Sequence, residues 1–276
     1  MRIYLEKPDL ASLNKRFSCF DMHVHSRYSD SFTRPSTLVK KAEKFGIGFA
    51  MTDHNEIKAF KEIKKMRPSC PVIPGIEIGV AEGPHILAYF YRYSDLQHFF
   101  ERTVKPFRNK NPYMNTLLPI NRLLESAEEY PCFLAAAHPE VPPYYGLSLT
   151  TNKGLTTKQQ LDKVPVFEVV NGFATEKMNL HAIKSAFELG KGFIGGSDSH
   201  IPKQFGSVVT CTSAPDADTT FNEITRHESV VVGKNMRARE RINPSARTVT
   251  RHLKYGGSFR DRAKSMAYHR RLKKHS

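Results

Sequence analysis

Two histidines separated by one residue, His23 and His25, end an apolar run near the N-terminus of the chain. In an extended strand, residues i and i+2 point to the same face, so both imidazoles can reach one metal ion. Such a pair alone is as compatible with a structural role as with metal binding. A second alternating pair, Asp198 and His200, follows an apolar run that ends in two glycines. These two pairs are the starting point for predicting a metal site.

Other potential ligands follow apolar runs elsewhere, and each also has a plainer interpretation. Asp30 lies in a loop, where an aspartate more often forms a turn or a cap. His54 follows Asp53, and this polar pair could simply begin the next helix. Glu77 lies between apolar residues, so its carboxylate faces either solvent or a polar site, because an unpartnered buried charge is costly. His138 follows three alanines, which leave room around it.

Taken together, these residues indicate a metal site, because separate structural roles do not explain why so many imidazoles and carboxylates follow apolar runs. Imidazole and carboxylate ligands without thiolates suit Zn²⁺, Mn²⁺ or Fe²⁺. Nine donors are too many for one ion and are enough for two or three. Six of the twelve histidines belong to this set, and the other six lack a comparable setting. The predicted ligands are His23, His25, Asp30, His54, Glu77, His85, His138, Asp198 and His200.

The elements that must position these residues alternate between strand-like and helix-like patterns, which predicts an α/β fold with a largely parallel sheet. Sites in such folds lie at the carboxyl ends of the strands. The predicted strands are 19–23, 47–52, 72–78, 86–91, 132–137, 166–170 and 192–196. The predicted helices are 36–45, 56–66, 95–102, 115–130, 157–162 and 176–189, with 103–114 and 139–156 irregular.

The connection between Ile78 and Ile86 has only seven residues and contains Gly79, Gly83 and Pro84. This is too short for a helical crossover, so we predict an antiparallel hairpin. The start of its second strand then lies beside the end of its first. The hairpin therefore places His85 at the same edge of the sheet as Glu77.

Composition places the chain among ordinary globular proteins, with 276 residues and 39% hydrophobic residues. No apolar run approaches the roughly 18 residues of a membrane span, and the N-terminus lacks the apolar stretch of a signal peptide. We therefore expect a cytoplasmic protein. The four cysteines are scattered, and we expect reduced, mostly structural thiols rather than a disulfide framework.

The net charge of +15 is unevenly distributed. Residues 234–276 carry fourteen Lys or Arg and two Asp or Glu, whereas the first 233 residues are nearly balanced. Attraction to nucleic acid or an anionic surface would come mainly from this tail. A helix packed on the body with a charged outer face, or a disordered end, also explains the tail and is slightly favoured.

The set of motifs resembles the PHP (polymerase and histidinol phosphatase) family over roughly residues 19–202. The matching segments appear in family order, and no ligand position is lost. They are Asp21–His25 with Tyr28–Asp30, Thr52–His54, Gly75–Glu77, His85–Leu87, Ala137–Pro139, Glu168–Gly172 and Gly196–His200. This resemblance implies a distorted seven-stranded (β/α) barrel, which we assign to residues 1–233. The charge and pattern of residues 234–276 predict a basic, partly helical extension after it.

The resemblance also implies a trinuclear metal centre. One ion would be held by His23, His25, Glu77 and Asp198, and a second by Glu77, His85 and His138. The third would use Asp30, His54 and His200, with Asp30 the position at which relatives differ. The segment from Arg92 to Asn121 departs most from the family, so substrate recognition does not carry over.

The family's usual reaction is hydrolysis of a phosphate ester by a hydroxide that bridges metal ions and attacks phosphorus. Asp198, His200 and His25 are the residues expected to act in catalysis. Arg27, Asn171 and Lys177, with Lys153 as a further candidate, are expected to contact substrate, although the cations also suit a solvated surface.

The substrate expected from this reaction is a small phosphate monoester, a nucleotide or an oligonucleotide end. An alternative function is binding of nucleic acid or an anionic surface through the basic tail. Hydrolysis of a C–N bond, as in amidohydrolases, is disfavoured because no lysine stands where a bridging carbamate would be needed. The sequence does not indicate an oligomeric state.

Overall fold

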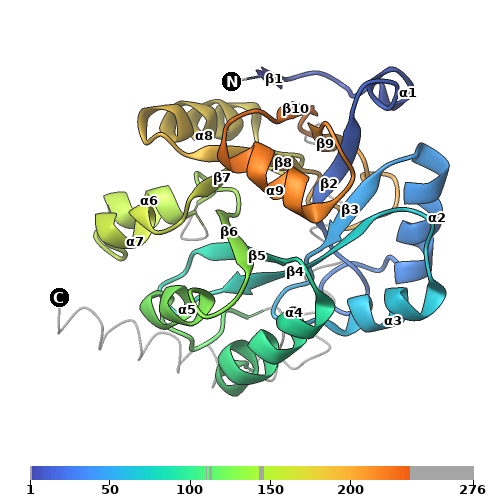
Figure 1. Cartoon of the computed structure of the whole chain (residues 1–276). Helices are drawn as coiled ribbons and strands as arrows, with labels where there is room; N and C mark the ends of the chain where they lie inside the picture. The colour runs from blue at the N-terminus through green and yellow to red at the C-terminus, as the bar shows by residue number, and fades with distance from the viewer. Residues whose placement is uncertain (1, 110, 112–113, 143–145, 237–276) are drawn as a thin grey trace.

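The computed structural model describes residues 2–109, 111, 114–142 and 146–236 as an α/β fold built on one curled, ten-stranded sheet. Helices surround the outside of this sheet (Figure 1). The strands are β1 (Arg2–Tyr4), β2 (Ser18–Val24), β3 (Gly48–Met51), β4 (Val72–Gly79), β5 (His85–Phe90), β6 (Cys132–Ala136), β7 (Val166–Asn171), β8 (Gly192–Gly196), β9 (Val208–Thr212) and β10 (Val230–Gly233). Their order in the sheet is β1-β10-β9-β2-β3-β4-β5-β6-β7-β8.

The seven predicted strands are all present as β2 to β8, and β3, β5, β7 and β8 are buried along their whole length. A strand with apolar residues on both faces must be buried on both sides. The curl of the sheet buries one face, and the outer helices bury the other. The predicted number of seven strands was too low. Three further strands, β9, β10 and β1, extend the sheet beyond β2, beginning with β9 antiparallel to β2.

The curl brings β8 back against β2, although the two strands lie far apart in the sheet order. The Asp198 amide donates to the His23 carbonyl over 2.8 Å, and the His25 amide donates to the Ser199 carbonyl over 3.2 Å. Gly196 permits this approach, since a Cβ there would lie 2.3 Å from the His23 Cβ. The two alternating pairs of the sequence therefore meet across the junction.

The predicted hairpin is confirmed: β4 and β5 pair antiparallel, with Gly79 opposite His85 and Glu77 opposite Leu87. β5 is also antiparallel to β6 on its other side, whereas β6, β7 and β8 pair in parallel. The reversed strand β5 consequently begins, rather than ends, at the edge where its parallel neighbours end. That geometry carries His85 to the same edge as Glu77.

The helices are α1 (Leu10–Leu13), α2 (Pro35–Phe45), α3 (Lys58–Met66), α4 (Tyr93–Phe99), α5 (Ile120–Ala127), α6 (Leu147–Asn152), α7 (Lys158–Asp162), α8 (Glu176–Glu188) and α9 (Ala217–Thr225). A π-helical turn, η1 (Phe100–Val104), and a 3-10 turn, η2 (Lys105–Phe107), follow α4. All six predicted helices are present. Helix α2 has Pro35 in its first turn and ends at Gly46 with a φ of 66°, as its sequence signals indicate.

Three helical features differ from the prediction. Helix α5 begins at Ile120 rather than near Asn115, because Asn115 and Thr116 bond instead to carbonyl oxygens of the β4–β5 hairpin. Helix α6 lies inside the segment predicted to be irregular, and two helices, α1 and α9, were not predicted.

Two cysteines are joined, contrary to the expectation of reduced thiols. Cys19 on β2 and Cys211 on β9 stand directly opposite each other in the antiparallel pair and form a disulfide. The widely separated sequence positions gave no sign of this pairing. Cys70 and Cys132 are free, as expected.

The basic extension predicted for 234–276 lies almost wholly outside the described residues, which end at Met236. No helix among residues 2–109, 111, 114–142 and 146–236 is long and apolar enough to cross a membrane.

Candidate metal centre

The structure brings all nine predicted ligands to one edge of the curled sheet. The strands determine where these side chains lie. Strand β2 and the residue after it supply His23 and His25, β4 supplies Glu77, and the residues after β8 supply Asp198 and His200. The other four come from loops after β2, β3 and β6 and from the first residue of β5. Side chains as far apart in the sequence as His23 and His200, 177 residues, therefore form a single cluster.

Glu77 lies at the middle of this cluster and is completely buried. Five imidazole rings surround its carboxylate. Its Oε2 lies near His54 Nδ1 (2.9 Å), His23 Nε2 (3.2 Å) and His25 Nε2 (3.3 Å), and its Oε1 near His85 Nδ1 (2.9 Å) and His138 Nε2 (3.2 Å). A carboxylate in this position can bridge neighbouring cations.

The alternating pair on β2 forms the first part of the cluster with Asp198. His23 Nε2 and His25 Nε2 face each other at 3.0 Å. Asp198 Oδ1 lies 3.0 Å from His25 Nε2 and 3.7 Å from His23 Nε2. These atoms, together with Glu77, match the first ligand group implied by the family resemblance.

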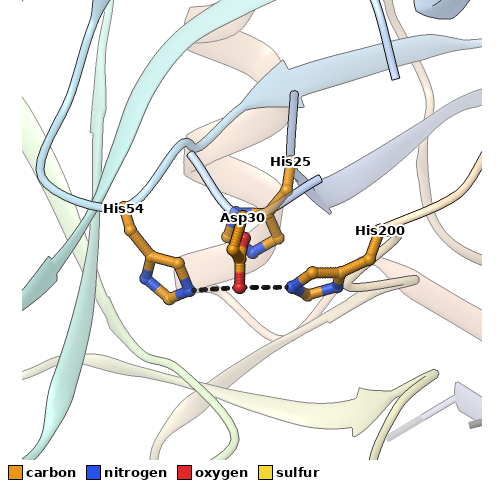
Figure 2. A group of neighbouring side chains, drawn as sticks. All are labelled: His25, Asp30, His54 and His200. Atoms are coloured by element: carbon orange, nitrogen blue, oxygen red, sulfur yellow. Dashed lines mark hydrogen bonds and ion pairs between the residues drawn. The ribbon is translucent and has the colours of Figure 1, made fainter. Parts of the chain in front are cut away.

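The third group is shown in Figure 2, where Asp30 stands between His54 and His200. Asp30 Oδ2 lies 2.8 Å from His200 Nε2 and 3.5 Å from His54 Nε2, and Asp30 Oδ1 lies 3.8 Å from His25 Nδ1. His25 thus belongs to this group as well as to the first. His54 in turn also groups with Glu77 and His85. The structure therefore shares more donors between neighbouring groups than the sequence implied.

The electrostatic setting separates the histidines into two kinds. Burial lowers the pKa of His25 to about 4 and also lowers the pKa of His85, so both rings are neutral near pH 7. Burial lowers the pKa of His200 as well, but the Asp30 carboxylate outweighs it and raises the value to about 9. For His23 and His54 the carboxylates likewise overcome burial and raise the pKa well above its usual value.

Two residues of the cluster have a left-handed backbone that side chains rarely adopt. His138 has a φ of 30° and Asp198 a φ of 51°. Such conformations cost on the order of 1–3 kcal/mol each and persist where the surrounding structure enforces them, most often at functional sites. Here they turn both side chains inward at the point where the chain leaves β6 and β8.

Glu168 is a supporting residue whose role the sequence did not reveal. It is fully buried on β7, and its Oε1 accepts a hydrogen bond from His23 Nδ1 over 3.0 Å. Its Oε2 accepts from the His138 backbone amide (2.8 Å) and from the Asn171 side chain (3.0 Å). A carboxylate behind a histidine fixes the tautomer whose second nitrogen faces the metal.

Two further buried carboxylates hold the loops that carry the ligands. Asp21 accepts hydrogen bonds from the Ser197 amide and hydroxyl and from the Gly206 amide at 2.6–2.8 Å. Asp53 accepts from the Ser26 amide and hydroxyl and from the Ser29 hydroxyl at 2.6–2.7 Å. Both aspartates precede a predicted ligand in the sequence motifs, which was the available signal.

Asn115 supports His85 in a similar way. Its Oδ1 lies 3.2 Å from His85 Nε2, and its Nδ2 donates to the carbonyls of Val80 and Gly83. An amide oxygen only accepts, so this contact keeps the proton on Nε2 and leaves Nδ1 directed at Glu77. Asn115 lies in a segment without regular structure, where sequence pattern carries little information.

Of the predicted substrate contacts, Asn171 lines the cavity beside the cluster, and the three cations do not. Asn171 lines the central cavity, with its Nδ2 donating to Glu168 and Asp198. Arg27 instead pairs with Glu62 at 3.0 Å on the surface. Lys177 and Lys153 are exposed and do not line the cavity, although Lys177 lies between two residues that do, Thr175 and Met178.

The cluster opens into a cavity of about 460 Å³. One side is polar and consists of seven of the nine predicted ligands, all but His23 and His25, with Asn171 and Thr175. The other side is apolar and consists of Val141, Pro142, Phe173, Ala174 and Met178. Among the described lining residues none is Lys or Arg. A second cavity of about 410 Å³, around Tyr91, Cys132 and Phe221, contains none of the predicted ligands.

The cluster fits a set of divalent cations. The Glu77 Oε2 atom is buried and accepts no hydrogen bond from any described group, although three imidazole nitrogens lie within 3.3 Å of it. Two ring nitrogens at 3.0 Å from each other need a shared proton or a cation between them. Imidazole and carboxylate donors without thiolate are the ligands of Zn²⁺, Mn²⁺ and Fe²⁺ sites.

Comparison with family models assigns two segments of the chain. The model of the PHP domain matches residues 21–152, and the model described as PHP-associated matches residues 176–227. Between them these segments contain all nine predicted ligands. No curated protein sequence is significantly similar to this chain.

Solved structures with a similar fold include endonuclease Q bound to a 27-mer duplex substrate with an abasic lesion at the active site (TM-score 0.63, 17% identity, covering 79% of this chain). The chain spans 60% of the length of that endonuclease. The lesion-specific endonuclease of Pyrococcus furiosus is also similar (TM-score 0.62, 18% identity, covering 78% of this chain and 57% of the other).

A third is a two-domain protein of Bacteroides vulgatus ATCC 8482 that contains a predicted PHP-like metal-dependent phosphoesterase (TM-score 0.54, 17% identity, covering 88% and 73%). At these identities the three likenesses show the fold.

Proposed function

We propose that this chain, which belongs to the PHP family, is a metal-dependent phosphoesterase with two or three divalent ions (Mn²⁺, Zn²⁺ or Fe²⁺) at the Glu77 cluster. The observation that carries this proposal is the gathering of nine imidazole and carboxylate side chains, with the buried Glu77 at their middle, beside a cavity. An endonuclease and a predicted metal-dependent phosphoesterase are among the proteins of similar fold, which supports the same reaction class.

The bound ions would neutralise phosphoryl oxygens, activate a water molecule for attack on phosphorus and stabilise the leaving oxygen. The protein's own residues prepare this chemistry by fixing tautomers. Glu168 holds the Nδ1 proton of His23, and the Asp198 carbonyl accepts from His200 Nδ1 over 2.8 Å. In both rings Nδ1 keeps its proton, so Nε2, which faces the centre, is the nitrogen that would bind an ion.

His25 is prepared by burial instead, because a pKa of about 4 keeps it neutral and able to bind a metal ion at pH 7. We retain Asp198, His200 and His25 as the residues closest to the chemistry. Their position among the donors favours holding the ions over acting as free acids or bases.

The substrate carries its negative charge into a cavity whose described walls have no Lys or Arg. Neutralisation of the phosphate therefore falls to the ions, which explains why so many donors are gathered there. We propose a phosphate ester of a small molecule, a nucleotide or an oligonucleotide end as substrate.

Replacing His25 with alanine tests this function. Because His25 lies in two of the ligand groups, His25→Ala should lower both the bound metal and the rate of phosphate ester hydrolysis. The matched control is His181→Ala, which changes an exposed histidine on α8. Metal content is measured by elemental analysis, and rates with Mn²⁺ on p-nitrophenyl phosphate, nucleotides and short RNA.

Unchanged metal content in His25→Ala would refute the ligand assignment. If the wild-type protein binds metal but hydrolyses none of these phosphate esters, the proposed function itself is wrong.

Nucleic-acid binding through the basic tail is the second candidate function, and the position of Met236 favours it. The Met236 amide donates to the Gly172 carbonyl over 2.8 Å, and Gly172 directly precedes Phe173 in the cavity wall. The described chain therefore ends, at Met236, beside the cavity, and the sequence that follows it carries thirteen Lys or Arg and two Asp or Glu. Basic residues attached at this point would extend the site toward neighbouring phosphates.

The full-length variant with Arg237, Arg239 and Arg241 changed to glutamine tests this candidate. The plot of log K for oligonucleotide binding against log salt concentration has a negative slope. Loss of three phosphate contacts should make this slope shallower by about 2–3. The control changes Lys61, Lys64 and Lys65 of α3 to glutamine. Equal salt dependence in wild type and both variants would refute a role for these arginines.

A further inference from the structure

We propose that the apolar wall of the cavity is a nucleobase subsite, with Phe173 as the residue that selects phosphate esters carrying a base. This inference rests on the proposed phosphoesterase function, because the phosphate would occupy the opposite, metal-binding side. It goes further by naming the part of the substrate that the protein itself recognises.

The wall is continuous with the metal cluster rather than separate from it. The Phe173 ring lies 5.8 Å from the His200 ring, and Met178, Val141 and Pro142 complete the same side of the cavity. Phe173, Met178 and Val141 are only partly buried, and Pro142 is exposed. A group bound beside the ions would therefore meet apolar surface that the protein leaves uncovered.

The backbone under Phe173 is fixed, which gives the wall a defined position. The Asn171 Oδ1 atom accepts hydrogen bonds from the amides of Phe173 (2.8 Å) and Ala174 (2.9 Å). The Nδ2 atom of the same side chain donates to Asp198 over 3.2 Å. One side chain thus ties the position of the aromatic wall to a predicted metal ligand.

The next turn of chain is fixed as well. The Thr175 hydroxyl caps α8 by accepting from the Met178 amide over 3.2 Å, which holds Met178 in the wall. A wall supported in this way can act as a platform without rearranging when a ligand binds.

The chemistry of the wall favours a flat aromatic group over other substrate groups. No described lining residue is a Lys or Arg that would pair with a second phosphate or a carboxylate inside the cavity. An aromatic ring with a flexible thioether beside it packs against the face of a base, and such stacking is tolerant of which base is bound. A sugar phosphate without a base would leave the wall in contact with water.

The chain contains no tryptophan, so a tryptophan placed in the wall reports on binding by itself. The test is Phe173→Trp in the full-length, Mn²⁺-loaded protein. The probe is the phosphonate analogue of adenosine 5′-monophosphate, in which a methylene replaces the ester oxygen and prevents hydrolysis. The comparison probe is the same sugar phosphonate without the base, and the control variant is Phe187→Trp on the outer face of α8, where Phe187 is 75% exposed.

The adenosine phosphonate should quench the fluorescence of Phe173→Trp to saturation and leave Phe187→Trp unchanged. It should also bind about tenfold or more tightly than the base-free phosphonate, as expected for stacking on one aromatic side chain. Unchanged fluorescence in Phe173→Trp together with equal affinities for the two phosphonates would overturn the proposal.

Phe173→Leu and Met178→Ala provide a second measurement that does not depend on the tryptophan. In both variants the preference for adenosine 5′-monophosphate over ribose 5-phosphate, compared as kcat/KM, should fall several-fold through KM, with kcat little changed. An unchanged preference would also contradict the subsite. If wild-type protein hydrolyses neither compound nor p-nitrophenyl phosphate, the phosphoesterase function fails, whereas hydrolysis of all three without preference refutes the subsite alone.

Discussion

Replacing Glu168 with glutamine is the sharpest test of how this centre is organised, because the change removes a charge without removing volume. Glu168 is not a predicted ligand, yet it holds His23 Nδ1 with one oxygen and the His138 amide with the other. A glutamine can orient its amide in two ways, and each loses a contact. With its oxygen toward His23, its NH₂ group faces the His138 amide hydrogen.

In the other orientation the NH₂ group faces His23 Nδ1. That nitrogen must then give up its proton, and the proton moves to Nε2, where the metal ion should bind. Each orientation therefore sacrifices one buried hydrogen bond to a charged group, which is typically worth about 1.5–3 kcal/mol. Removing such a partner behind a metal-binding histidine typically lowers metal affinity by about 10–100-fold, and we expect Glu168→Gln to fall in that range.

The assay is competitive metal titration of the purified protein with a chromophoric chelator, followed by phosphate ester hydrolysis at saturating Mn²⁺. The control is Glu82→Gln, since Glu82 is also buried and accepts a backbone amide, that of Ile120, over 2.9 Å. Glu82 contacts no predicted ligand in the hydrogen bonds and ion pairs of the described residues. Metal affinity in Glu168→Gln equal to that of wild type would refute the assigned role of the carboxylate.

Three further predictions concern protons, the disulfide and the core. The pKa of His200 is about 9 in the metal-free fold, against an ordinary value of 6.5. The protonated ring stabilises the metal-free fold, and this stability is lost as pH rises from about 6.5 to about 9. The increase in Tm on adding Mn²⁺ should therefore grow over this range, and a constant increase would contradict the assignment. Alkylation of the unfolded, unreduced protein should label two of the four cysteines by mass, Cys70 and Cys132, whereas four labels would show that Cys19 and Cys211 are not joined. Tyr89→Phe should lower the free energy of unfolding by about 1 kcal/mol, because the buried Tyr89 hydroxyl donates to the Met22 carbonyl over 2.7 Å, and an unchanged denaturation midpoint would exclude this contribution.

The limits of β2 to β8 were easier to predict than those of the helices for a physical reason. A strand buried on both faces appears as a short apolar run bounded by Gly, Pro or polar residues, and β2 to β8 all have this form. Helix limits depend on contacts outside the helix. Asn115 and Thr116 have a helix-compatible sequence, but they bond to the β4–β5 hairpin and delay α5 until Ile120.

That the predicted ligands lie together was predictable because all of them except Asp30 stand at or close to a strand end, and the length of one connection placed His85. The supporting residues were not, because nothing local distinguishes Glu168 from a carboxylate that faces solvent. Its role depends on β7 lying next to β8 in the sheet and on β8 returning to β2. The same holds for the bond between Cys19 and Cys211, which are 192 residues apart.

The junction of β8 with β2 explains why so many acidic and basic groups can be buried at one place. Gly196 lets the backbones approach, and the Asp198 amide then reaches the His23 carbonyl. Asp21 reinforces the junction by accepting from Ser197 on the β8 side and from Gly206 beyond it. Because Asp21 is held by these donors, the loop with Asp198 and His200 is fixed before any ion binds. Conformational strain at Asp198 is then supported by the sheet, and binding of metal ions need not order the loop.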